Sequence, residues 1–221
     1  MVESAVKKPF PGYMKAFFHE MGLTSTYLDE NKPLIYNRAK LFGYSIIYFH
    51  FTEKMLFYCF RYYVRNEKGR LENAPIVDNS YKWAGGGFLS TSEDLIKFGN
   101  AMLYSYQNSD GYLNRETAIM IWTPVENTSM GWDKDGKYGM GWGVVPSQMN
   151  FPFCNSRRFY ISHTGGAIGA SSVLLVLPRT DETISNDKPV SGIVVSMIVN
   201  LQCVGLNQTA LEIAKVFDQV K

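Results

Sequence analysis

The run His163-Thr164-Gly165-Gly166 contains the residue types in this sequence best suited to binding a reacting group. The hydroxyl of Thr164 can hold a carboxylate or an amide, and the two glycines leave room for a ligand backbone. A glycine N–H at such a point can also stabilise a developing oxyanion. Taken alone, the run is equally compatible with a β-turn or bulge carrying a surface histidine. A binding wall of this kind also needs a nucleophile opposite it.

Four segments around this run have the apolar, β-branched composition of strands, with polar or Gly/Pro turns between them. Their residue ranges are 138–145, 158–162, 169–178 and 192–200. Short connections favour antiparallel neighbours, so we expect an antiparallel sheet in which His163 follows the end of the second strand. Residues 207–220 predict a closing helix with Asn207 as N-cap. Its inner stripe is expected to consist of Ala210, Ile213, Ala214 and Phe217.

The first half of the chain is predicted to be helical where apolar residues recur at helical spacing. Residues 12–21 carry such a stripe. The glycines at 85–87 allow a tight turn, after which Thr91 offers an N-cap with Asp94 three residues on. A shorter helix is expected over 116–122. Together these elements indicate an α/β (α+β) fold class with an antiparallel sheet flanked by helices.

The bulk composition describes one domain and argues against several classes of function. With 221 residues and 46% hydrophobic content, the chain can bury one sizeable core. A net charge of +2 without a basic stripe argues against a nucleic-acid partner. The three cysteines include no C-x-x-C and the three histidines form no ligand spacing, so neither a metal nor another cofactor is expected. The first residues resemble neither a signal peptide nor a mitochondrial presequence, so no targeting segment is expected in this chain.

Residues 41–60 differ from the rest of the chain because they are rich in Phe and Tyr without a clear period. Glu53 and Lys54 interrupt the run, so neither a membrane span nor membrane contact is expected from it. We interpret this segment as an insertion that derives from translated intron sequence or an alternative exon. A genuine lineage-specific insertion is the alternative interpretation.

Three stretches, in chain order, resemble the serine β-lactamase and penicillin-binding-protein family: AGGGFLSTSEDLIKFGNAML, KYGMGWGVV and SHTGGAIGASSVLLVLP. The resemblance is strongest to the class C-like branch, which includes esterases and D-aminopeptidases, and to its animal mitochondrial members. It covers residues 2–40 and 61–221. It implies a β-lactamase/transpeptidase-like fold that is truncated at the N-terminus, with residues 1–221 as the C-terminal part of one domain.

The same resemblance implies roles for individual residues. The family closes its site with a Lys/His-Thr-Gly strand, which His163, Thr164 and Gly165 match. His163 and Thr164 would bind substrate and steer charge. The N–H of Gly166 would be the second donor of the oxyanion hole, paired with the nucleophile's own N–H.

The family nucleophile is the serine of a Ser-x-x-Lys motif, and Ser4-Ala5-Val6-Lys7 is a literal match. We interpret the match as coincidental, because only three residues precede Ser4 while the family positions its serine with upstream strands. Pro9 also prevents a long helix after Lys7. Tyr112-Leu113-Asn114, a literal match to the family's second motif, is likewise interpreted as structural. No credible catalytic residue is therefore expected in this chain.

The sequence thus predicts part of a serine hydrolase that cleaves amide or peptide bonds through an acyl-enzyme, with this chain inactive by itself. The resemblance implies a mitochondrial protease linked to lipid metabolism. The alternative is a non-catalytic module that self-assembles into a homo-oligomer or filament.

Overall fold

The computed structural model describes residues 1–30, 62–150, 154–179 and 190–219. Its centre is a five-stranded antiparallel sheet in the order β11-β10-β9-β6-β5. The strands of this sheet are β5 (Lys137–Tyr138), β6 (Gly143–Val145), β9 (Tyr160–Ala167), β10 (Ala170–Pro178) and β11 (Gly192–Val199). Residues 41–60 lie outside the described ranges, so the interpretation of that segment as an insertion stays a prediction.

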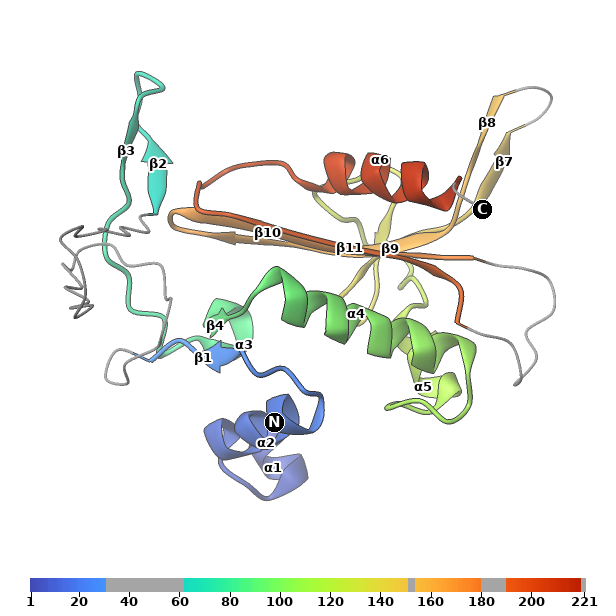
Figure 1. The fold of residues 1–221 in the computed structure, drawn as a ribbon, viewed down its shortest axis with the longest axis horizontal. Helices are drawn as coiled ribbons and strands as arrows, with labels where there is room; N and C mark the ends of the chain where they lie inside the picture. Colours follow the sequence, from blue (N-terminus) through green and yellow to red (C-terminus); the bar gives the residue numbers. More distant parts are fainter. Residues whose placement is uncertain (31–61, 151–153, 180–189, 220–221) are drawn as a thin grey trace, which may run out of the picture.

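Two helices cover opposite faces of the sheet and give the molecule three layers (Figure 1). Helix α4 (Ser92–Gln107) contacts β10 and β11 on one face, and α6 (Asn207–Asp218) contacts the same strands on the other. Each face buries its own apolar cluster. Val173, Leu175 and Leu177 belong to the cluster that includes α6 residues, whereas Leu174 and Val176 belong to the cluster that includes α4 residues. This alternation along β10 follows from the two-residue period of a strand.

The remaining elements lie around this core. The short helices are α1 (Val2–Val6), α2 (Phe10–Glu20), α3 (Trp83–Gly86) and α5 (Arg115–Ile121). Three two-stranded pairs are formed by β1 (Tyr27–Leu28) with β4 (Phe88–Leu89), β2 (Tyr63–Arg65) with β3 (Leu71–Asn73), and β7 (Gln148–Asn150) with β8 (Cys154–Arg157). Mixed helices with an antiparallel sheet confirm the predicted fold class.

The expected N-cap of α4 is present and has a tertiary role. The side chain of Thr91 accepts a hydrogen bond from the backbone N–H of Asp94 at 3.2 Å. The Asp94 carboxylate is buried and accepts hydrogen bonds from the Ser25 backbone and the Thr26 hydroxyl, both at 2.8 Å. The start of α4 thus fixes the segment that follows α2.

Three details of the sequence prediction are wrong for tertiary reasons. Residues 138–145 form two strands, β5 and β6, with a turn between them, because Tyr138 pairs back onto Gly143. Asn207 is the first residue of α6 and does not cap it, since its amide donates to the Tyr160 hydroxyl at 3.4 Å. Phe217 is 61% exposed and Leu211 is buried, so Phe217 is not part of the inner stripe.

Candidate functional site

The His-Thr-Gly run lies inside a strand and not after one. Strand β9 continues through Ala167, and the chain turns into β10 at Ile168 and Gly169, where Gly169 has a φ of +81°. The prediction that the second strand ends before His163 is therefore wrong. The two glycines give a weak local strand signal, but pairing with β10 holds the run extended.

Among the described strands, one backbone edge of β9 has no pairing partner along this run. Strand β6 pairs with β9 only from Tyr160 to Ser162, where Gly143 lies opposite Ser162. From His163 to Ala167, the only neighbour of β9 among the described strands is β10. An open strand edge presents backbone N–H and C=O groups that can bind an extended chain.

The pairing with β10 explains why a glycine follows Thr164. His163, Thr164 and Gly165 lie opposite Leu174, Val173 and Ser172, respectively. A Cβ atom on Gly165 would lie 2.3 Å from the Ser172 hydroxyl oxygen, which is closer than real contacts allow. A Cβ atom on Gly166 would meet nothing within 4 Å among the described residues. The two glycines therefore differ, because a side chain at Gly165 would force the Ser172 hydroxyl to move, whereas one at Gly166 would meet no described residue.

The side chain of His163 is held by an aromatic corner formed by Tyr138 and Trp132. Its Nε2 lies 2.7 Å from the Tyr138 hydroxyl, and its Nδ1 lies 2.7 Å from the carbonyl oxygen of Thr164. The imidazole also lies against the Trp132 ring, with 5.2 Å between the ring centroids. Both ring nitrogens are thus already hydrogen-bonded.

The aromatic corner is itself fixed by further hydrogen bonds. The indole N–H of Trp132 donates to the hydroxyl of Ser162 at 3.0 Å, and Ser162 is fully buried. The hydroxyl oxygen of Thr128 accepts from the backbone N–H of Tyr138 at 2.9 Å and lies 3.0 Å from the Tyr138 carbonyl oxygen. Sequence reasoning missed Tyr138 and Trp132 as site residues. For Tyr138 the available signal was the YGMGW stretch, residues 138–142, but its register against Ser162 depends on the β5–β6 turn; Trp132 lies outside that stretch.

The structure does not bring Ser4 and Lys7 to this strand. Ser4 lies on α1, a five-residue helix with no side-chain cap and no buried residue. Lys7 follows that helix in the left-handed region with a φ of +54°. In Figure 1, α1 lies at the bottom, well separated from β9, with α4 between them.

The Tyr112-x-Asn114 match has a structural explanation. The side chain of Asn114 caps α5 by accepting a hydrogen bond from the backbone N–H of Thr117 at 2.7 Å. The ring of Tyr112 packs edge-on against Phe17 of α2, with 5.7 Å between the centroids. Both side chains therefore have partners that do not belong to the His163 region.

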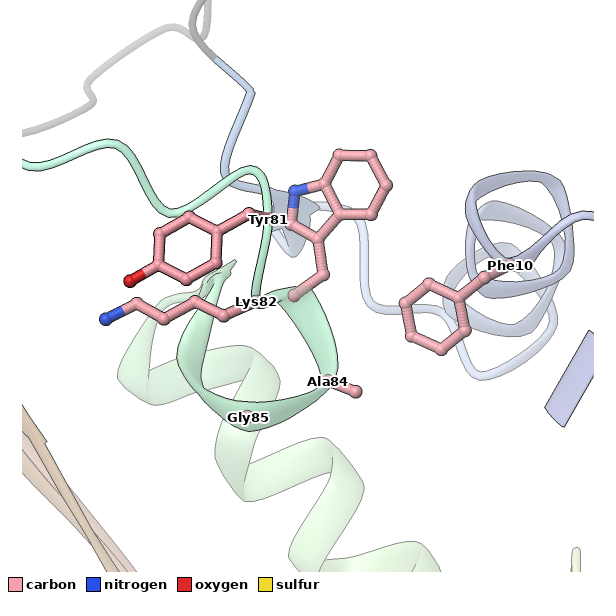
Figure 2. Close-up of a pocket in the computed structure, with 6 residues that line it drawn as sticks. Phe10, Tyr81, Lys82, Ala84 and Gly85 are labelled. Atoms are coloured by element: carbon pink, nitrogen blue, oxygen red, sulfur yellow. The ribbon is translucent and has the colours of Figure 1, made fainter. Parts of the chain in front are cut away.

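A separate open pocket of about 240 Å³ lies between α2 and α3. Its lining residues are Phe10, Tyr81, Lys82, Trp83, Ala84 and Gly85. Figure 2 shows the Lys82 side chain extended beside the ring of Tyr81, and the ammonium lies 5.8 Å from the ring centroid. None of these residues belongs to the His-Thr-Gly run, so this pocket is not the site described above.

Within the described ranges, no group of three or more His, Cys, Asp or Glu side chains could hold a metal ion. No helix among the described residues is long and apolar enough to cross a membrane. The expectations of no metal, no cofactor and no nucleic-acid partner stay predictions.

Comparison with known proteins identifies the family. The β-lactamase family model matches residues 3–210, so the chain belongs to the β-lactamase family. Human and mouse proteins named "Serine beta-lactamase-like protein LACTB, mitochondrial" are 52% and 51% identical to it, in each case over 99% of the chain. The chain spans 38% of the length of these relatives.

A solved structure agrees on the fold. The crystal structure of a penicillin-binding protein from Bacillus halodurans superimposes with a TM-score of 0.59 at 17% identity. The match covers 98% of this chain and 52% of that one. The resemblance drawn from the three sequence stretches is therefore confirmed for family and fold.

Proposed function

We propose that this chain supplies the substrate-binding strand of a serine hydrolase that cleaves amide or peptide bonds through an acyl-enzyme. One observation carries the proposal: the His-Thr-Gly run lies on a strand whose backbone edge is open among the described strands. Thr164 is half-buried and Gly166 is exposed, so a hydroxyl and a backbone N–H are available near that edge. Membership of the β-lactamase family supports the same chemistry.

In this proposal the substrate lies along the open edge of β9. The Thr164 hydroxyl would bind a carboxylate or amide of the substrate, and the N–H of Gly166 would stabilise the oxyanion. The nucleophile would be a serine that is not Ser4, since Ser4 is exposed on a short helix far from β9. We therefore propose that the chain does not hydrolyse substrate by itself.

A chimera tests this proposal. The aligned segment of the human relative is replaced by this chain, and both proteins are assayed on a peptide anilide. If the human parent is active, the chimera should be active as well. Thr164→Val in the chimera should then lower kcat/KM by about tenfold, the value of one hydrogen bond. Thr123→Val, which removes an exposed hydroxyl bonded only to its own helix, is the matched control. An active parent with an inactive but folded chimera would contradict the proposal.

We also propose a mitochondrial location for the protein, because the relatives carry that word in their names. Fractionation of cells from the source organism, probed with an antibody against this chain, tests it. Recovery in a fraction without mitochondria would contradict the proposal.

Self-assembly is a second candidate function, and the edge strand β11 favours it. Among the described strands, β11 pairs only with β10, so its other edge is open. Ile198 on this strand is 38% exposed, and an open edge with apolar side chains can pair between chains. Sedimentation velocity of the chain should then show oligomers that Ile198→Lys reduces. A monomer at all concentrations would exclude this candidate.

A further inference from the structure

The hydrogen bonds of His163 specify which of its ring nitrogens carries the proton. A carbonyl oxygen can only accept, so the contact of 2.7 Å between Nδ1 and the Thr164 carbonyl requires a proton on Nδ1. A neutral imidazole has one N–H, and Nε2 must then be the unprotonated nitrogen. The hydroxyl of Tyr138, 2.7 Å from Nε2, is therefore the donor in that contact.

We infer that Tyr138 is a positioning residue: by donating to Nε2 it holds the imidazole where Nδ1–H meets the Thr164 carbonyl, so the two contacts together fix the Nδ1–H tautomer. The tyrosine can do so because its own position is fixed. Its backbone N–H donates to the Thr128 hydroxyl, and its ring packs edge-on against Trp132 with 6.2 Å between centroids. Trp132 in turn covers the imidazole and is held by the buried hydroxyl of Ser162. The orientation of His163 is thus set from strands β5 and β9 together.

This arrangement determines which groups would meet a substrate, a consequence that rests on the proposed function. Both imidazole nitrogens are occupied within the protein, so neither is available as a direct acceptor. The Tyr138 hydroxyl oxygen keeps a lone pair after donating to Nε2. A substrate N–H at this corner would therefore donate a hydrogen bond to the hydroxyl oxygen of Tyr138. Thr164 and the β9 backbone would bind the rest of the substrate.

Nuclear magnetic resonance of the complete chain labelled with ¹⁵N-histidine tests the inference without any substrate. The chain has three histidines, and a His163→Gln variant assigns the signal of His163. In alkaline buffer, two-bond ¹⁵N–¹H correlations separate the two tautomers. We expect His163 to show a protonated Nδ1 and an unprotonated Nε2.

The variant Tyr138→Phe should lose this single-tautomer pattern and give a mixture that includes protonated Nε2. Tyr112→Phe, which removes a hydroxyl far from His163 and keeps the ring contact with Phe17, should leave the pattern unchanged. Circular dichroism checks that each variant is folded. An unchanged tautomer in folded Tyr138→Phe would overturn the inference.

The wild-type spectrum alone is also decisive, because a protonated Nε2 there would overturn the inference even if Tyr138→Phe did not fold. This outcome is separate from the test of function. An inactive chimera with the expected tautomer would contradict only the hydrolase proposal, whereas an active chimera with the other tautomer would contradict only the inference about Tyr138.

Discussion

The corner around His163 and the helix that carries Ser4 both match sequence motifs of the same family, yet their surroundings differ. His163 is hydrogen-bonded through both nitrogens and lies against Trp132, which bonds to a fully buried serine. Ser4 is exposed on a helix of five residues that buries none of its side chains. A short motif can therefore take part in chemistry only where the surrounding strands and side chains fix its position.

The largest effect is expected where the His-Thr-Gly run is most tightly packed. Gly165→Val should lower the free energy of unfolding by about 2 kcal/mol, the middle of the range for overpacking. The reason is that its Cβ would lie 2.3 Å from the Ser172 hydroxyl oxygen. Urea unfolding measures the change. Gly166→Val is the matched control and should cost less than about 0.5 kcal/mol. Equal losses for the two variants would show that β9 is not packed as described.

A comparable effect is expected from the support of the aromatic corner. Trp132→Phe should cost about 2 kcal/mol, because it leaves the buried hydroxyl of Ser162 without the indole donor. Combining it with Ser162→Ala should recover part of the loss, since both partners are then removed. Thermal unfolding of the two single variants and the double variant measures this coupling. Strict additivity of the two losses would contradict the contact.

The literal Tyr-x-Asn match should behave as a helix cap. Asn114→Ala should cost about 1 kcal/mol, the usual value of an N-cap side chain, because it removes the bond to the Thr117 backbone N–H. Tyr112→Phe should leave stability unchanged. Urea midpoints compare the stabilities of the two variants. A larger loss for Tyr112→Phe than for Asn114→Ala would argue against the structural interpretation.

The smallest effects are expected on α1. Ser4→Ala should change the free energy of unfolding by less than about 0.5 kcal/mol, as exposed substitutions usually do. Lys7→Gly should be neutral or slightly stabilising, because glycine adopts the left-handed conformation of Lys7 without a steric penalty. A loss above about 1 kcal/mol in either variant, measured by urea unfolding, would show that α1 is held by contacts that the structure does not contain.

Local signals were sufficient for much of the fold. The Thr91 cap, the helical stripe near residues 12–21 and the apolar runs that became β10 and β11 all appear close to where the sequence predicted them. Each of these signals depends on residues near one another in the chain. The predicted antiparallel arrangement is confirmed, and short turns account for it directly only between β5 and β6 and between β9 and β10.

The features that were missed depend on partners distant in sequence. Strand β9 runs through glycines because β10 pairs with them, and the Asn207 side chain is directed to Tyr160 and not to the helix backbone. The contact of Tyr138 with His163 requires both the β5–β6 turn and the register of β6 against β9. The sequence located the third motif and singled out the stretch that contains Tyr138, but nothing local showed that Tyr138 and Trp132 meet His163.

The most direct test of the central claim is labelling of the complete chain with a fluorophosphonate probe, read by intact mass and peptide mapping. We predict no adduct, because Ser4 and Lys7 are exposed on α1 and separated from β9. The active-serine control is an established serine hydrolase treated in parallel. A stoichiometric adduct on Ser4 that disappears in Ser4→Ala would contradict the account, since it would make α1 the source of the nucleophile.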